Sequence, residues 1–168
     1  MIGIGVDLVE VDRIRTVLAR TPTLAARCFT EGERAYAEAA NDPAERFAAR
    51  FAAKEAVMKA MGVGLGAIDW HDVEVVRNAE GAPRLVVSGR AAALAGELGV
   101  TRWLLTLTHT ETMAEAIAVA LSSDPWVRPD RGSGRPGSRW RRGRRARRAG
   151  GSERRSPPRQ RRRGRGRR

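Results

Sequence analysis

Residues 46–66 read RFAARFAAKEAVMKAMGVGLG and carry the longest helical signal of the chain. Their large apolar side chains recur at spacings of three, four and seven residues, as on one buried face of a helix. Alanine, the strongest helix former, occupies much of the remainder. We therefore predict a long helix over residues 44–61 that ends in the glycine-rich loop after it.

The segments around this helix predict strands and shorter helices. Residues 2–8 alternate, with the larger apolar residues on one face, which we expect in the core, and Gly3, Gly5 and Asp7 on the other. Strands are also predicted at 72–78, 84–89, 101–109 and 114–121, and helices at 11–20, 30–40 and 90–99. This order indicates an α+β fold with a mainly antiparallel sheet packed on the long helix.

Charge divides the 168 residues into two parts. Residues 1–122 carry 13 basic and 16 acidic residues, a net charge of −3. Residues 123–168 carry 19 arginines and 3 acidic residues, a net charge of +16, and are too poor in aliphatic residues to form a core. We predict one folded domain at 1–122 and a disordered Arg/Gly/Pro-rich tail at 123–168. The tail is either a polybasic arm for nucleic acid or, as we favour, a solvated extension without function.

Cysteine content and hydropathy bear on the compartment. A single cysteine, Cys28, can form no internal disulfide, which fits a reducing environment. No basic leader precedes a long apolar run, and the longest apolar stretches are much shorter than a membrane span. We therefore expect a cytoplasmic protein without a membrane span.

The predicted long helix holds the only two lysines among 32 basic residues, Lys54 and Lys59. Residues four apart share a helix flank, so Glu55 lies beside Lys59 and Arg50 beside Lys54. Such residues also form ordinary ion pairs on solvated helix faces. A chain that otherwise uses arginine, however, retains lysine where a site needs an ammonium that can release a proton. The cations Arg50, Lys54 and Lys59 are therefore candidates for a phosphate-binding site, with Glu55 beside them.

Asp7 and His109 are two further candidates. Asp7, on the glycine face of the first strand, is either a surface residue or part of a Mg²⁺ site with Glu55. Mg²⁺ is usually bound through one or two carboxylates, together with phosphates and waters. His109 ends the strand at 101–109, where a single histidine is either structural or part of a site.

Four segments together resemble holo-acyl carrier protein synthase, the small bacterial-type branch of the 4′-phosphopantetheinyl transferases. They are GIGVDLVEVDRI (3–14), FTEGERAYA (29–37), RFAARFAAKEAVMKAMGVGLG (46–66) and LTLTHTETMAEAIAVA (105–120). They occur in the family's order and spacing and cover most of residues 1–122, but none of the tail. The resemblance implies transfer of the phosphopantetheine group of coenzyme A to a serine of apo-acyl carrier protein. The second product is adenosine 3′,5′-bisphosphate.

The resemblance also implies roles for single residues. Asp7 and Glu55 match the family's Mg²⁺ ligands, and Lys59 matches the lysine at the pyrophosphate. His109 matches a histidine near the metal and the nucleotide. The residues expected at coenzyme A are Arg50, Lys54, Gly62, Gly64 and Gly66.

The chemistry of the reaction does not decide which group removes the proton of the serine hydroxyl. Lys59 would stabilise charge on the leaving phosphate and could donate a proton to it. The serine proton would pass to Glu55, directly or through a water on the metal, or to His109.

The partners follow from the same resemblance. Arg13 and Arg20, with Arg27 after them, lie where the family docks its acidic carrier protein. The family further implies a homotrimer with active sites between subunits. A nucleic-acid-binding protein that acts through its Arg-rich tail is the alternative.

Overall fold

A computed structural model describes residues 1–123 of the chain. Each helix and strand predicted above is present, with ends shifted by at most two residues, and the α+β class is confirmed. The elements in chain order are β1 (Gly3–Glu10), α1 (Val11–Arg20), α2 (Thr23–Cys28), α3 (Glu31–Glu38), α4 (Pro43–Met61), the 3-10 turn η1 (Trp70–Asp72), β2 (Val73–Arg77), β3 (Pro83–Val87), α5 (Gly89–Glu97), β4 (Arg102–His109) and β5 (Met113–Leu121).

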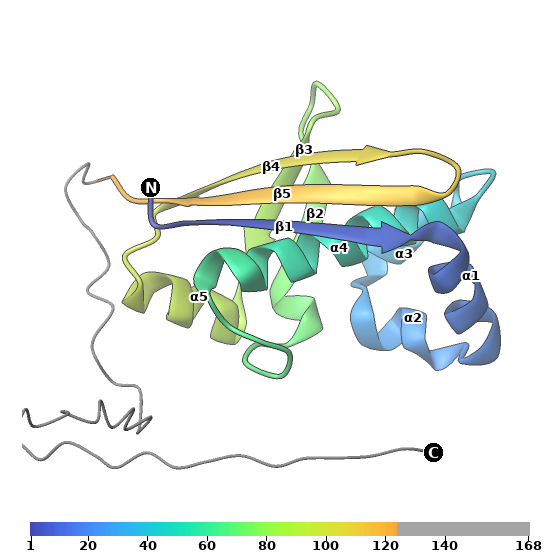
Figure 1. Ribbon diagram of the computed structural model, residues 1–168, viewed down its shortest axis with the longest axis horizontal. Coiled ribbons are helices and arrows are strands. Elements are labelled where there is room, and N and C mark those ends of the chain that lie inside the picture. The colour runs from blue at the N-terminus through green and yellow to red at the C-terminus, as the bar shows by residue number, and fades with distance from the viewer. Residues whose placement is uncertain (124–168) are drawn as a thin grey trace, which may run out of the picture. The chain divides into compact units, whose positions relative to one another are not determined.

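Two antiparallel sheets organise these elements. β5 is the centre of a three-stranded sheet, with β1 on one side and β4 on the other. Figure 1 shows these strands as one layer lying across α4. β2 and β3 form a separate hairpin. The register places Asp7 opposite Ala116 and His109 opposite Ala114, so both candidates lie on the face of the sheet that carries the buried alanines.

Small residues allow the sheet to pack closely on α4. A Cβ atom added to Gly3 or Gly5 would lie 1.9 Å from the carbonyl oxygen of Ala60 or Ala56, respectively. Glycine is therefore required here by the close approach of two backbones. Asp7 is the next residue on the same face of β1, so this packing delivers its carboxylate to α4.

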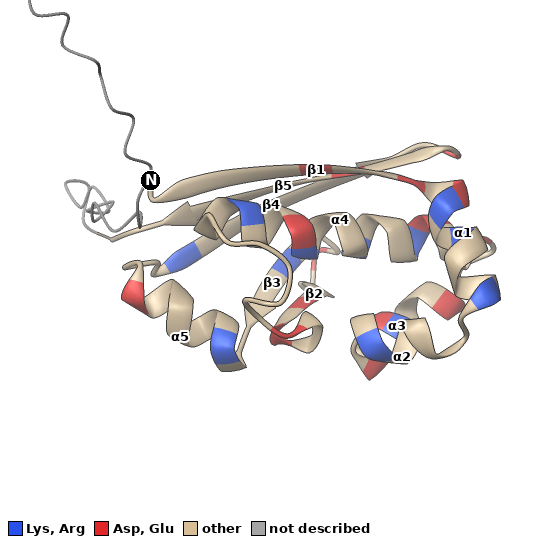
Figure 2. Cartoon of the chain, turned by 60° about the horizontal axis from the view of Figure 1, so that its bottom comes forward, with Lys and Arg blue, Asp and Glu red and all other residues tan. Residues whose placement is uncertain are grey.

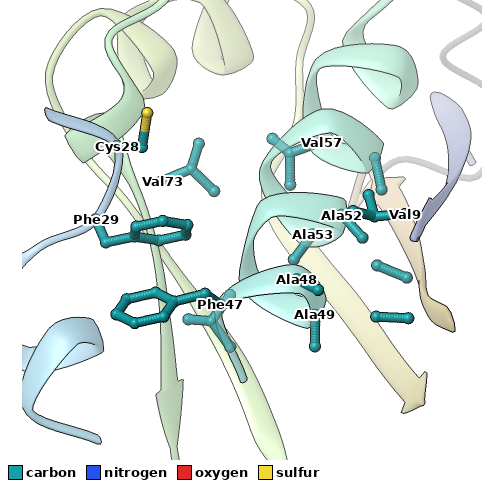
Figure 3. Packing of buried hydrophobic residues seen from close by; sticks show 14 of the residues in the cluster. Val9, Cys28, Phe29, Phe47, Ala48, Ala49, Ala52, Ala53, Val57 and Val73 are labelled. Atoms are coloured by element: carbon teal, nitrogen blue, oxygen red, sulfur yellow. The ribbon is translucent and has the colours of Figure 1, made fainter. Parts of the chain in front are cut away.

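A second part of the core lies on another side of α4. Figure 3 shows Phe29 and Phe47 there with Val73, whereas Ala48 and Ala52 are directed toward the strands. The two phenylalanine rings have their centres 4.8 Å apart. α4 is therefore covered on several flanks by segments distant in sequence.

The expectation for β1 was wrong about which face is buried. Ile4, Val6 and Leu8 point away from α4 and are 55%, 44% and 59% exposed. Ile4 and Leu104 both pair with Val119 of β5, so the exposed Leu104 belongs to the same outer face. The error arose because large apolar residues usually mark the core, whereas this helix contact admits only glycine. The described chain consequently exposes an apolar sheet face.

The Arg-rich tail lies outside the described residues from position 124 onward. Its expected disorder, the favoured absence of a function and the alternative role in nucleic-acid binding therefore stay predictions. Within residues 1–123, no helix has the length and hydropathy needed to cross a membrane.

Candidate active site

Asp7 and Lys59 form an ion pair between β1 and the last turn of α4. The Lys59 ammonium donates hydrogen bonds to Asp7 Oδ1 at 2.7 Å and to the carbonyl oxygen of Val6 at 2.9 Å. The Asp7 side chain is 15% exposed and that of Lys59 is 49% exposed. The pair therefore lies at the surface, where a solute can reach the ammonium.

Glu55 lies one helical turn before Lys59 and completes what we call the carboxylate–lysine cluster (Asp7, Glu55 and Lys59). Burial raises the pKa of Glu55 above its ordinary value, and the charge of Asp7 raises it further, whereas Lys59 lowers it. Repulsion between Asp7 and Glu55 indicates that the two carboxylates lie near each other. Two neighbouring carboxylates suit a divalent cation, and hard oxygen ligands suit Mg²⁺.

Two carboxylates also fit the number of protein ligands that magnesium usually takes. Mg²⁺ rarely has an all-protein cage and commonly keeps one or two carboxylates with water and substrate phosphate. Asp7 and Glu55 could therefore hold this ion while leaving positions for a phosphate ligand.

A cavity of about 1030 Å³, which we call the large cavity, opens beside the cluster. Asp7 and Glu55 line it, and so do Arg13 of α1 and Arg27 of α2. Its apolar wall includes Val17, Leu24, Phe51 and Trp70. A cavity that combines charged and apolar side chains suits a ligand with a charged head and a less polar arm.

Arg20, the remaining arginine that we expected to bind a partner protein, has a different position from Arg13 and Arg27. Arg20 lies in the exposed last turn of α1 and does not line the large cavity. Figure 2 shows basic residues on both α1 and α2. The two short helices thus present positive charge at the mouth of the cavity and on the surface next to it.

Arg50 and His109 line a second, smaller pocket of about 150 Å³, which we call the arginine pocket. The guanidinium carbons of Arg46, Arg50 and Arg77 lie 6.0, 4.1 and 5.6 Å from the ring centre of Tyr36. Arg50 is 4% exposed, burial lowers its pKa, and its Nε has no hydrogen-bond partner within the described chain. No carboxylate of residues 1–123 lines this pocket. Its chemistry is that of an anion site.

One chain does not bring the two sites together. Successive residues of a helix are about 100° apart, so Arg46 and Arg50 share one flank of α4 and Glu55 lies on another. His109 Nε2 lies 3.6 Å from Glu45 Oε2, and His109 lines the arginine pocket together with Arg46 and Arg50. Of the candidates from the sequence, the chain gathers Asp7, Glu55 and Lys59, and it keeps Arg50 and His109 apart from them.

Comparison with known proteins now identifies the family. The model of the 4′-phosphopantetheinyl transferase superfamily matches residues 3–120. The chain belongs to this family. The holo-[acyl-carrier-protein] synthase of Salinispora arenicola is 50% identical over 121 residues, which are 71% of this chain and 98% of that protein. The protein of the same name from Moorella thermoacetica is 46% identical over 123 residues, 73% of this chain and 96% of that protein.

Solved structures agree with the family assignment. The holo-[acyl-carrier-protein] synthase of Neisseria meningitidis is 32% identical with a TM-score of 0.67, over 73% of this chain and 100% of that one. The enzyme of Bacillus anthracis, in complex with CoA (3′,5′-ADP), is 34% identical with a TM-score of 0.61, over 73% and 97%. The resemblance drawn from the four sequence segments is thereby confirmed.

Lys54 requires a correction, because in this transferase it is fully buried. Its ammonium pairs with Glu33 Oε2 at 2.8 Å and donates to the carbonyl oxygens of Trp70, at 2.8 Å, and Val73. An ammonium has three N–H donors, so none is left for a phosphate of coenzyme A. Helix spacing placed Lys54 on a free flank, but α3 and η1 cover that flank.

The glycine loop of the transferase has a backbone role. Gly62 and Gly66 have φ angles of 73° and 86°, and Gly62 caps α4 through hydrogen bonds to the carbonyls of Lys59 and Met58. A Cβ added at Gly62, Gly64 or Gly66 meets nothing within 4 Å. The glycines at 62 and 66 therefore serve the turn, and contact of the loop with coenzyme A stays a prediction.

Sequence reasoning missed several residues of these sites. Arg46 could have been found, because it lies four residues before Arg50 on the same flank. Tyr36 and Arg77 come from other elements and carry no local signal. The sequence indicated Glu33 only as part of a capping box with Thr30, and this capping box is present. It gave no indication that Glu33 also pairs with Lys54.

Proposed function

We propose that the chain is a holo-acyl carrier protein synthase. It transfers the 4′-phosphopantetheine group of coenzyme A to a serine of apo-acyl carrier protein and releases adenosine 3′,5′-bisphosphate. The carboxylate–lysine cluster carries the proposal, since it places two carboxylates at a large cavity and an ammonium on one of them. Relatives of this name match the domain over nearly their whole length, which supports it.

Asp7 and Glu55 are the residues that we propose for Mg²⁺. Bound there, the ion would neutralise charge on the pyrophosphate of coenzyme A. Asp7, one of these carboxylates, also holds the Lys59 ammonium beside this position. Cationic groups would thus meet the phosphates on two sides.

Lys59 is the group that we propose for the leaving phosphate. The serine oxygen forms a bond to the phosphorus of the pantetheine phosphate, and the P–O bond to the adenosine phosphate breaks. The electron pair leaves with adenosine 3′,5′-bisphosphate. Because Lys59 is half exposed, its ammonium can turn from Asp7 to the oxygen on which this charge develops.

Glu55 is the base that we propose for the serine hydroxyl. Its carboxylate lines the large cavity and would take the proton directly or through a water on the metal. His109 lies at the arginine pocket instead, which suits contact with the nucleotide end of coenzyme A.

Coenzyme A, we propose, lies between two copies of the chain. Its 3′-phosphate would occupy the arginine pocket of one copy and its pyrophosphate the cluster of the next, because one chain keeps these sites on different flanks of α4. The exposed apolar face with Ile4, Val6 and Leu8 supports association of copies. A homotrimer, which the family resemblance implies, would cover this face.

Arg13 and Arg20 are proposed to bind the acidic carrier protein. Arg13 lines the large cavity and Arg20 is exposed further along the same helix, so an acidic helix docked on α1 would present its serine to the cavity. Arg27 adds positive charge on α2. We also propose a cytoplasmic location, supported by the single, buried Cys28.

The proposal is tested by following both products with apo-acyl carrier protein, coenzyme A and Mg²⁺. We expect equal amounts of holo-carrier and adenosine 3′,5′-bisphosphate. A carrier whose serine is replaced by alanine should give neither product, and Asp7→Asn should abolish both. Nucleotide release that continues with the alanine carrier would indicate hydrolysis of coenzyme A and contradict the proposal.

A further inference from the structure

The ion pair between Glu33 and Lys54 is buried, with exposed fractions of 1% and 0%. Glu33 Oε2 lies 2.8 Å from the Lys54 ammonium and also accepts from the N–H of Thr30 at 3.1 Å. Glu33 Oε1 accepts from the N–H of Val75 at 2.9 Å. One carboxylate thus joins α3 to β2 and, through Lys54, to α4.

Lys54 connects this network to the wall of the large cavity. Its other two donors reach the carbonyl oxygens of Trp70, the first residue of η1, and of Val73, which directly follows η1. Trp70 and His71 line the large cavity, and the Trp70 ring stacks on Phe51 with ring centres 5.0 Å apart. The ammonium therefore fixes the segment that forms one side of the cavity.

A further contact links this wall to α2. His71 Nε2 lies 3.0 Å from the carbonyl oxygen of Ala26. Cys28, two residues later, also lines the large cavity. A shift of η1 would consequently be transmitted to a second part of the cavity wall.

Stability alone does not explain a buried ion pair at this position. Apolar side chains of similar volume often stabilise a core equally well, because they avoid the desolvation of two charges. An ammonium differs in providing three directional donors at one nitrogen, which here hold three acceptors from different segments. Arginine spreads its donors over a planar fork, so this geometry also accounts for lysine in an arginine-rich chain.

We propose that Glu33 and Lys54 are positioning residues, which hold residues 69–71 so that the large cavity accepts the phosphopantetheine arm of coenzyme A. The identity of the ligand rests on the proposed function, whereas the fixing of the wall rests on the contacts above. Neither residue touches the substrate, since both act through Trp70 and His71.

The test compares the full-length chain with two variants and a control. Lys54→Met leaves Glu33 without its partner, whereas Glu33→Gln/Lys54→Met removes both charges and keeps an acceptor for the N–H of Val75. Val57→Ala, a buried position on α4 outside the network, is the matched control. The measurements are Tm, the Kd values of coenzyme A and of adenosine 3′,5′-bisphosphate, and the rate at which a thiol reagent labels Cys28, the single cysteine of the chain.

Stability and binding should separate in these variants. Lys54→Met lowers Tm by about 10 °C or more, and the double variant recovers most of that loss. The double variant still binds coenzyme A about tenfold more weakly, because its wall is displaced, while its Kd for adenosine 3′,5′-bisphosphate changes less than about twofold. Its Cys28 is labelled about tenfold faster or more. Val57→Ala lowers Tm without changing the ratio of the two Kd values.

A double variant with recovered Tm, unchanged Kd for coenzyme A and unchanged Cys28 labelling would overturn the proposal. An equal rise in the Kd values of coenzyme A and adenosine 3′,5′-bisphosphate would overturn it too. If the double variant does not fold, Glu33→Gln is measured in its place: it keeps the shape of the network but leaves the buried Lys54 ammonium without its counter-charge, so the test then rests on the ratio of the two Kd values and on Cys28 labelling, not on Tm. Should the wild-type chain bind no coenzyme A, the proposed function fails, and the labelling rates of Cys28 still decide whether the pair holds the wall.

Discussion

The ammonium of Lys59 lies 2.7 Å from Asp7 Oδ1, across the contact between β1 and the last turn of α4. This pair exists because Gly3 and Gly5 let the strand lie on the helix backbone, and Asp7 follows them on the same face. The packing of the fold and the chemistry of the site are therefore set by one strand.

Lys59→Arg should impair turnover although it keeps the positive charge. The planar guanidinium cannot release a proton near neutral pH and places its donors differently. We expect kcat to fall about 100-fold or more, with a smaller change in KM for coenzyme A. Steady-state kinetics with saturating carrier protein measures both values. Unimpaired kcat would show that Lys59 neither donates a proton nor fits the leaving phosphate closely.

The two lysines should differ in their effect on stability. Lys54→Met leaves the buried Glu33 carboxylate without a partner and should lower the free energy of unfolding by about 3–5 kcal/mol. Lys59→Met removes a half-exposed ion pair and should change the free energy of unfolding by less than about 1 kcal/mol. Urea denaturation at one protein concentration gives both values. Similar losses for the two variants would contradict the burial of Lys54.

Glu55 should make stability depend on pH. Burial, and then the charge of Asp7, raise its folded-state pKa above the ordinary value of 4.5. The folded protein thus holds this proton more tightly than the unfolded chain, and the contribution of Glu55 to stability falls as pH rises from 4.5 through the folded pKa. Glu55→Gln should therefore gain stability relative to the wild type over this window. A difference between the two proteins that stays constant from pH 4 to pH 7, measured without Mg²⁺, would refute the raised pKa.

Gly5→Ala should disrupt the contact between β1 and α4. Its Cβ would lie 1.9 Å from the carbonyl oxygen of Ala56, so strand or helix must move, at a cost of about 3 kcal/mol. Gly64→Ala is the control, because a Cβ there meets nothing within 4 Å and no positive φ is imposed. Its free energy of unfolding should change by less than about 0.5 kcal/mol. Equal tolerance of both alanines in urea denaturation would contradict the close packing of β1.

Arg13→Glu should weaken binding of the carrier protein selectively. The reversed charge repels an acidic partner, so KM for apo-carrier should rise about tenfold while KM for coenzyme A is unchanged. Arg90→Glu, an exposed charge reversal on α5, is the matched control and should leave both values unchanged. Kinetics at two salt concentrations measures the effect. An equal response of the two variants would assign it to net charge instead of docking.

Local sequence patterns predicted much of the fold and half of the site. The period of α4, the capping box at Thr30 and the alternation in β4 and β5 are short-range signals, and each element is present. Asp7, Glu55 and Lys59, which match a family pattern in the sequence, also lie near one another in the structure, while their roles stay predictions. These predictions were correct because helix spacing and strand alternation hardly depend on the rest of the chain.

The failures share a physical cause, which is packing between distant segments. Lys54 lies on a helix flank that looks free in sequence, but α3 and η1 cover it. The buried face of β1 was misassigned because the helix backbone itself occupies the space where larger side chains would go. Helix spacing did place Arg50 and Glu55 on different flanks of α4, whereas nothing in the spacing showed that His109 of β4 joins Arg50 at the arginine pocket.

The intact mass of apo-acyl carrier protein, after incubation with the full-length chain, coenzyme A and Mg²⁺, tests the central claim most directly. The wild type should convert the carrier to a species heavier by one phosphopantetheine group. Glu55→Gln, which removes one proposed ligand and the proposed base, should leave nearly all of it unmodified at the same time point. A carrier that stays unmodified with the wild type, or one modified equally fast by Glu55→Gln, would contradict the role assigned to the cluster of Asp7, Glu55 and Lys59.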